Sequence, residues 1–169
     1  MLSKKLEQAM NDQVNAEFWS AYLYLSMSVH FSSAGLPGAA NWFKIQYQEE
    51  CDHAEKFMNY VIARGGKITL KPIAKVATSW KSLLEAFKDT LAHEQKVTAM
   101  INNLYEIAVE DKDYASQSLL NWFVDEQVEE EETAQSKIDA LNLIGDGYGL
   151  YQYDKELQTR VYTPITTQE

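Results

Sequence analysis

Five side chains that can bind a metal ion stand at positions where helical spacing favours apolar residues. They are Glu17, Glu50, His53, Glu94 and Glu130. An isolated carboxylate in a protein interior is too costly to keep ionised, so it must be protonated, paired with a cation or bound to a metal. No lysine or arginine stands on the same helix faces near these acids, where it could pair with all four of them. Oxygen ligands with one imidazole suit Fe(II), Mn(II) or Zn(II) better than soft thiophilic metals, and their number allows two ions with bridging carboxylates.

Four apolar stripes identify the helix faces that carry these acids. Residues spaced by three and four lie on one helical face, which is the face that a bundle buries. Each stripe contains one glutamate near its middle. An alternative stays open. If the buried face of a helix is assigned wrongly by one residue, which is a rotation of about 100°, the acids would lie on solvated flanks. The stripes are Leu6, Met10, Val14, Glu17, Ala21, Tyr24; Phe43, Tyr47, Glu50, Ala54, Phe57, Val61; Leu84, Phe87, Leu91, Glu94, Thr98, Ile101, Tyr105; and Leu120, Phe123, Gln127, Glu130, Ala134, Ile138, Leu141.

Glycine and proline mark the boundaries of the elements that must position these acids. All seven glycines and three prolines fall in short clusters, which leaves long uninterrupted stretches typical of helices. Ser82-Leu-Leu-Glu85 has the form of a capping box and predicts a helix start near residue 82. We expect helices near 4–33, 38–64, 82–110 and 114–144, and a short fifth helix near 150–161.

Residues 65–81 form a connection too long to be an ordinary loop. Extended at about 3.3 Å per residue, it can span more than about 50 Å, whereas a helix of about 27 residues is only about 40 Å long. It can therefore cross the whole bundle and make the second and third helices parallel. The sequence predicts an all-α four-helix bundle with a long crossover between helices 2 and 3, in a single domain over 1–169 whose bundle covers about 4–144.

Composition excludes several classes of function. The chain has 169 residues, with 15 Lys+Arg against 25 Asp+Glu, and a net charge of −10. Such an acidic chain is not expected to bind nucleic acid or an anionic membrane. The single cysteine, Cys51, excludes intrachain disulfides and four-cysteine metal sites. Without an apolar run of about 20 residues or a signal sequence, we expect a cytoplasmic protein.

With these motifs, the sequence resembles a ferritin of the bacterial non-haem type over nearly its whole length. The resemblance rests on the run Glu50-Cys-Asp-His53 together with Asn15-Ala-Glu17, Gln48-Glu-Glu50, His93-Glu94 and Trp122 to Glu130. Many ferritin-like di-iron bundles have a glutamate on each of two helices and Glu-x-x-His on the other two. Here the fourth helix has Gln127-x-x-Glu130 and Thr133 where a second motif would end. This departure fits non-haem ferritins and counts against bacterioferritins. Cys51 stands where bacterioferritins have their haem-ligating methionine, so we expect no haem.

The resemblance implies a role for each matching residue. Glu17, Glu50 and His53 would bind a first iron, and Glu50 would bridge to a second iron held by Glu94 and Glu130. Gln127 would lie beside the second iron, with Tyr24 within hydrogen-bond reach and Trp122 near the site. A third iron site would use Glu49, Glu126 and Glu129, with Glu130 shared. Glu49 and Glu126 are equally consistent with surface acids, Tyr24 and Trp122 with core packing, and we expect structural roles for His30, His93 and Cys51.

The function implied is oxidation of Fe(II) by dioxygen and storage of Fe(III) as a mineral inside a homo-24-mer, with the fifth helix around a symmetry axis. Three other classes of protein share some of these features. A rubrerythrin-like oxidase is disfavoured because paired cysteines are missing, and a DNA-protecting mini-ferritin because its sites span two subunits. The third class is a metal-free acidic bundle that acts as a scaffold, and it predicts that Glu50→Ala, by removing a buried charge, stabilises the fold without affecting any metal.

Overall fold

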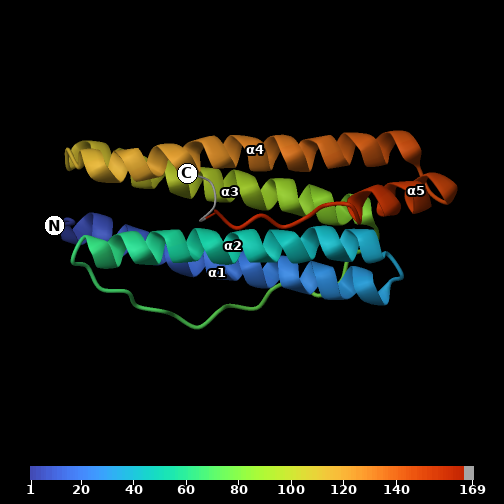
Figure 1. Cartoon of the computed structure of the whole chain (residues 1–169), viewed down its shortest axis with the longest axis horizontal. Helices are drawn as coiled ribbons and strands as arrows, with labels where there is room; N and C mark the ends of the chain where they lie inside the picture. Colours follow the sequence, from blue (N-terminus) through green and yellow to red (C-terminus); the bar gives the residue numbers. More distant parts are fainter. Residues whose placement is uncertain (166–169) are drawn as a thin grey trace.

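The computed structural model describes residues 1–165 and contains four long helices and a short fifth one (Figure 1). No strand occurs among these residues. The predicted all-α four-helix bundle is confirmed, whereas residues 166–169 of the predicted single domain lie outside the described part. The helices are α1 (Lys4–Ser33), α2 (Pro37–Ala63), α3 (Leu83–Glu110), α4 (Tyr114–Ile144) and α5 (Tyr148–Leu157).

Local capping groups fix the starts of the long helices. The Ser3 hydroxyl accepts from the Leu6 amide at 3.0 Å, and α2 begins with proline, whose fixed φ suits a first helical turn. At α3 the Ser82 hydroxyl accepts from the Glu85 amide, while the Glu85 carboxylate accepts from the Lys81 amide at 2.5 Å. The observed boundaries of the four long helices differ from the predicted ones by at most one residue.

The fifth helix differs more from its predicted span of 150–161. It begins at Tyr148, directly after Gly147, whose φ of 78° suits a residue without a side chain. It ends at Leu157, and the chain then continues as an extended segment. The side chain of Arg160 in that segment bonds α2.

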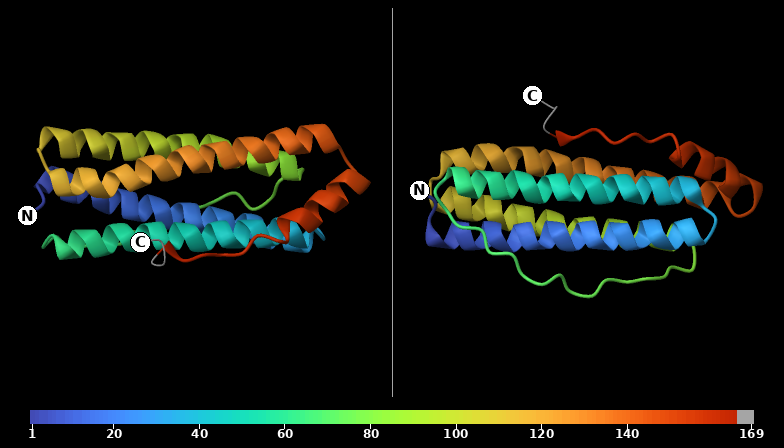
Figure 2. Two further views of the ribbon diagram at one scale, coloured as in Figure 1. Left: turned by 45° about the horizontal axis from the view of Figure 1, so that its top comes forward. Right: turned by 60° about the horizontal axis from the view of Figure 1, so that its bottom comes forward.

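Residues 64–82 cross the full length of the bundle on its outside (Figures 1 and 2). Two asparagines of α1 hold this crossover through its backbone. Asn11 accepts from the Thr69 amide at 2.7 Å and donates to the Lys67 carbonyl at 2.9 Å, and Asn15 pairs in the same way with Lys71 and Thr69. Because the crossover returns the chain to the other end, α2 and α3 run parallel, as predicted.

Two apolar clusters fill the bundle, one towards each end. One contains Met27, Phe31 and Phe43, and the other contains Leu6, Phe57 and Phe123. On every long helix the mid-length glutamate lies between residues of the two clusters. The polar residues of the interior are thus enclosed at both ends by apolar packing.

The buried face of α3 is rotated from the predicted stripe. Phe87, Glu94 and Ile101 are buried as expected, but the remaining buried positions include Leu83, Ala86, Thr90, Val97 and Leu104. Leu84, Leu91, Thr98 and Tyr105 are only half-buried. Thr90 can be buried because its hydroxyl donates to the Ala86 carbonyl at 3.0 Å. The predicted stripes of α1 and α4 are buried throughout.

Helix α5 is fastened to the start of α2 by one buried carboxylate. Asp154 accepts from the amides of Gly38 at 3.0 Å and Ala39 at 2.8 Å, which lie at the positive end of the α2 dipole. A Cβ at residue 38 would lie 1.6 Å from the Asp154 carbonyl oxygen, so only glycine fits there. This contact fixes where the chain beyond α5 can run.

No helix of residues 1–165 combines the length and apolarity needed to cross a membrane.

Replacing Asp154 with alanine is expected to release α5. The change leaves two amides at the start of α2 unpaired and should destabilise the docked helix by about 1–3 kcal/mol. We expect faster hydrogen exchange in residues 148–157 and a lower midpoint of thermal unfolding. Asp146→Ala removes an exposed acid just before the same helix and serves as the control. Equal exchange rates in the two variants would contradict the assigned anchor.

Candidate metal centre

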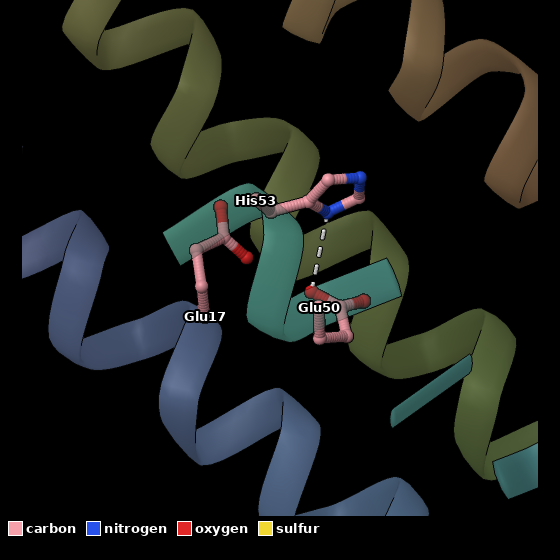
Figure 3. A group of neighbouring side chains, drawn as sticks. All are labelled: Glu17, Glu50 and His53. Carbon is pink, nitrogen blue, oxygen red and sulfur yellow. Dashed lines mark ion pairs between the residues drawn. The ribbon is translucent and has the colours of Figure 1, made fainter. Parts of the chain in front are cut away.

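Each of the four long helices contributes one buried glutamate to the middle of the bundle. Glu17 is 1% exposed, Glu50 2%, Glu94 0% and Glu130 7%. The alternative interpretation, which placed these acids on solvated flanks, is therefore wrong. On α2, His53 follows Glu50 by three residues, so the two side chains lie one helical turn apart and reach the same space (Figure 3).

Glu17, Glu50 and His53 form a compact group between α1 and α2. One potential ligand atom from each residue lies within 4.8 Å of the other two. His53 Nδ1 lies 3.4 Å from Glu50 Oε2 (Figure 3). Three buried atoms of the group, Glu17 Oε2, Glu50 Oε2 and His53 Nε2, have no hydrogen-bond partner among the described residues. Unsatisfied buried polar atoms are costly, and a metal ion bound between Glu17 and Glu50 would satisfy the two carboxylate oxygens.

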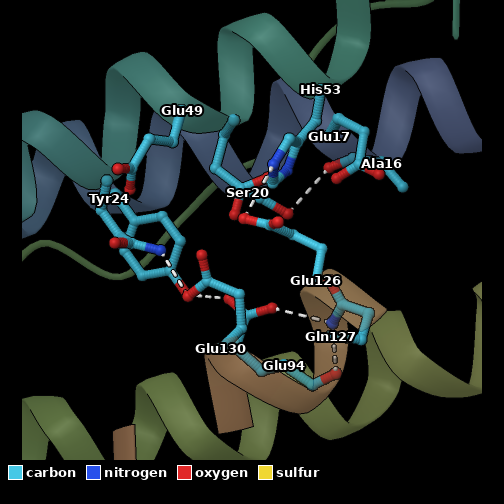
Figure 4. Close-up of polar contacts among 12 residues, drawn as sticks. Ala16, Glu17, Ser20, Tyr24, Glu49, His53, Glu94, Glu126, Gln127 and Glu130 are labelled. Carbon is cyan, nitrogen blue, oxygen red and sulfur yellow. Dashed lines mark hydrogen bonds and ion pairs between the residues drawn. The ribbon is translucent and has the colours of Figure 1, made fainter. Parts of the chain in front are cut away.

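Glu94 and Glu130 face this group from α3 and α4, each held by an amide or a hydroxyl (Figure 4). The Tyr24 hydroxyl donates to Glu94 Oε1. Gln127 Nε2 donates to Glu94 Oε2 at 3.2 Å and lies 3.3 Å from the Glu94 carbonyl oxygen. Gln46 Nε2 donates to Glu130 Oε2 at 2.7 Å. Because a carboxylate oxygen can accept more than one bond, both acids keep lone pairs for a metal.

Burial raises the pKa of every carboxylate in the layer, and repulsion between the acids adds to this rise for Glu17, Glu50 and Glu130. Burial is the main cause for Glu17, Glu50 and Glu94, and it raises the pKa of Glu130 to about 8. The charges of Glu94 and Glu130 raise the pKa of Glu50 further. Burial, followed by the charge of Glu94, also raises the pKa of Tyr24 well above its usual range. Protons or divalent cations must offset these charges.

The donor set fits hard or borderline divalent ions. Four carboxylates and one imidazole supply oxygen and nitrogen atoms and no thiolate. Among the residues that the structure describes, Glu17, Glu50 and His53 are the group whose ligand atoms converge closely enough to hold a metal ion.

The acids predicted for a third site line a pocket of about 380 Å³. Glu49, Glu126 and Glu129 line it, and Glu130 lies at its junction with the buried layer. Burial raises the pKa values of Glu49 and Glu126. His53 Nε2 lies 3.9 Å from Glu126 Oε1, so the imidazole stands between the two compartments. A larger cavity of about 770 Å³, between α1 and the crossover, has no carboxylate among its described lining residues and offers no comparable site.

The other residues singled out from the sequence have ordinary packing contacts. The Trp122 and His53 ring centroids are 5.6 Å apart. His93 Nε2 lies 2.7 Å from the Ser20 hydroxyl, and burial lowers the His93 pKa to about 4. His30 Nε2 lies 3.0 Å from the Trp80 carbonyl oxygen. Cys51 is half-buried on α2.

Two glutamines and one arginine contact the site without having been predicted. Gln13 Nε2 donates to Glu17 Oε1 at 2.9 Å, Gln46 bonds Glu130, and Arg160 bonds Glu49 at 2.6 Å. Gln13 precedes Glu17 by four residues on the same helix, a spacing that was available as a signal, whereas Gln46 bonds an acid of another helix that no local spacing indicates. Nothing in the local sequence connects Arg160 with Glu49.

Comparison with known proteins agrees with this geometry. Residues 7–144 match the ferritin-like domain family. The chain is 48% identical over 163 residues to a bacterial non-heme ferritin of Staphylococcus haemolyticus, covering 96% of this chain and 98% of that protein, and 45% identical to one of Staphylococcus aureus with the same coverage. Two structures of the Archaeoglobus fulgidus ferritin, an open-pore form and an engineered closed form, share 44% identity. Each superposes with a TM-score of 0.94 and covers 95% or 96% of this chain and all of the other. The chain belongs to the ferritin family.

Proposed function

We propose that this chain is an iron-storage protein with ferroxidase activity, which oxidises Fe(II) to Fe(III) with dioxygen and stores the product as a ferric mineral. Iron binding and storage follow from membership of the ferritin family. The observation that supports oxidation at this place is the enclosed layer of four glutamates and one histidine with unsatisfied oxygen and nitrogen atoms.

The two ferrous ions are substrates, and the proposed ligands follow from the contacts. Glu17, Glu50 and His53 hold the first ion, because their ligand atoms converge within 4.8 Å. Glu94 and Glu130 hold the second, and Glu50 bridges to it. Tyr24 and Gln127 orient Glu94 through hydrogen bonds. Such supporting contacts keep a ligand in place while the charge of the ion changes.

The layer favours oxidation for an electrostatic reason. Four carboxylates in a poorly solvated space stabilise a trivalent ion more than a divalent one, since attraction grows with charge. Two ferrous ions supply two electrons to one dioxygen molecule, and the apolar clusters at both ends exclude bulk water. Glu49, Glu126 and Glu129, with Glu130, form the proposed third iron site.

Storage needs a closed container, and we propose that the chain assembles into a homo-24-mer. The exposed apolar side chains at and before α5 support an interface there, because Leu143 is 87% exposed, Tyr148 76% and Tyr151 56%. A charge of −10 per subunit would attract cations to such a shell. A cytoplasmic location stays a prediction from the sequence.

Replacing Glu50 with alanine should abolish rapid iron oxidation while the assembly stays intact. The change removes the carboxylate shared by both ions, so we expect the initial rate of Fe(III) formation to fall by more than about 100-fold, beyond the loss typical of supporting residues. Absorbance after Fe(II) is added in air measures the rate, and particle mass measures assembly.

Glu55→Ala is the matched control, because it removes an exposed acid from the same helix. It should oxidise iron at the wild-type rate. An assembled Glu50→Ala protein that oxidised iron as fast as this control would refute the site. A metal-free scaffold would instead show no stoichiometric metal binding even in the unmodified protein.

Stability of the metal-free protein should fall as pH rises. In the folded state burial raises the pKa of Glu130 to about 8 from the ordinary 4.5, so the folded protein holds a proton that the unfolded chain has lost. The stabilisation is complete below pH of about 4.5 and is lost as pH approaches about 8. The unfolding midpoint should therefore be higher at a pH of about 5 than at about 8, and Zn(II) should reduce the difference.

Glu130→Gln tests the cause of this dependence. The amide stays neutral at every pH, so the midpoint should vary less with pH than in the unmodified protein. Glu132→Gln, which changes an exposed acid on the same helix, should leave the dependence intact. A similar slope in both variants would mean that general surface charge, not the buried layer, causes the effect.

A further inference from the structure

The segment that follows α5 turns back and lies along α2 (Figures 1 and 2). Its Arg160 side chain lines the acidic pocket. Arg160 attaches the segment most firmly. One guanidinium nitrogen donates to Gln46 Oε1 at 2.8 Å and lies 3.3 Å from the Trp42 carbonyl oxygen, and the other donates to Glu49 Oε2 at 2.6 Å. The guanidinium carbon lies 4.6 Å from the centre of the Trp42 ring. Two residues on, the Tyr162 hydroxyl donates to Asp52 at 2.5 Å.

Arg160 is the one cation among the described residues that line the pocket. Five carboxylates line it as well, those of Glu49, Asp125, Glu126, Glu129 and Glu130. The positive charge of Arg160 opposes the rise that burial causes in the pKa of Glu49. The side chain is only a quarter exposed, so its pairing with Glu49 is partly shielded from solvent.

A second feature indicates that the pocket takes a cation. His53 is 2% exposed, and within residues 1–165 its Nε2 atom has no hydrogen-bond partner, although it lies 3.9 Å from Glu126 Oε1. A buried nitrogen without a hydrogen-bond partner therefore lies next to Glu126, one of the acids that line the pocket. Arg160 holds one oxygen of Glu49, so a divalent ion near Glu126 that also used the Glu49 carboxylate would lie close to the guanidinium charge.

A single hydrogen-bonded path connects Arg160 with the buried layer. Arg160 donates to Gln46 Oε1, and Gln46 Nε2 donates to Glu130 Oε2 at 2.7 Å. This direction of the bonds orients the Gln46 amide, which in turn holds a Glu130 oxygen. Arg160 thus touches the third-site acid Glu49 directly and the shared acid Glu130 through one side chain.

We propose that Arg160 is a tethered counter-ion that sets the affinity of the third cation site, and that a divalent ion entering this site displaces it from Glu49 and frees the C-terminal segment. The inference rests on the proposed function, because it concerns the third of the proposed iron sites. Arg160 is a positioning residue here, since it acts through Glu49 and Gln46. A divalent ion and the guanidinium repel each other, so both cannot use the Glu49 carboxylate at full strength. The third ion therefore binds more weakly than the first two.

Calorimetric titration with Zn(II), which has no redox chemistry, tests the affinity directly. In the unmodified assembly we expect two tight sites and a weaker third one per chain. Arg160→Gln removes the competing charge and should tighten the third site by about tenfold or more, with the first two changed by less than about twofold. Arg160→Lys keeps the charge and should stay close to the unmodified protein. Lys155→Gln removes a nearby exposed charge that does not touch Glu49 and should have no effect.

Hydrogen exchange of residues 158–165 tests the displacement. Exchange in this segment should stay slow through the first two equivalents of Zn(II) and accelerate with the third. In Arg160→Gln it should be fast from the start, although α5 keeps its protection through Asp154. Equal third-site affinity in Arg160→Gln and Lys155→Gln, or no change in exchange at the third equivalent, would overturn the inference.

These outcomes differ from a failure of the proposed function. If the two tight sites were missing from the unmodified protein, the metal centre itself would be refuted, and the inference with it. If the two tight sites are present and the third does not respond to Arg160, only the role of Arg160 is refuted.

Discussion

Four carboxylates meet in the interior of this bundle, and their repulsion is the constraint on which the rest of the structure depends. The ionised form of each carboxylate is destabilised at neutral pH, because burial raises the pKa of all four. Apolar clusters on both sides keep water out, which strengthens the repulsion and equally strengthens the attraction for a cation. Repulsion among these carboxylates destabilises the metal-free protein, and a bound divalent ion would relieve it.

The remaining elements hold the layer in register. The crossover allows two antiparallel hairpins to place their midpoints at the same height, and the amide groups of Asn11 and Asn15 fix its path. Gln13, Gln46 and Gln127 each donate to one carboxylate oxygen of a buried glutamate. Neutral amides can orient acids in this way and leave their negative charge in place. A lysine or arginine at the same position would neutralise that charge. Arg160, which reaches this region from the C-terminal segment, lies at the pocket and outside the buried layer.

Much of the fold and of the candidate site could be predicted from the sequence because both depend on local pattern. Glycine and proline clusters and the Ser82 to Glu85 capping box predicted the long helices, and periodicity predicted the four buried glutamates. The predicted face of α3 was wrong in part, because apolar residues of α3 occupy two neighbouring stripes and the buried one contains Leu83, Ala86, Val97 and Leu104. Thr90 adds to the difference, since its hydroxyl is satisfied within the helix and it is buried where a pattern of apolar residues does not expect it. The roles of Asp154 and Arg160 were missed for another reason. Their partners, Gly38 and Glu49, are more than a hundred residues away, and only the three-dimensional path of the chain brings them together.

The most direct test is an anaerobic Fe(II) titration of the metal-free assembly, followed by addition of oxygen, with absorbance and particle mass recorded together. Two or three Fe(II) ions bound tightly per chain, prompt formation of Fe(III) and a cage-sized particle are the results expected from the buried carboxylate layer. Weak binding without stoichiometry, on a small oligomer, would contradict it, because the four acids would then have to be stabilised by protons alone.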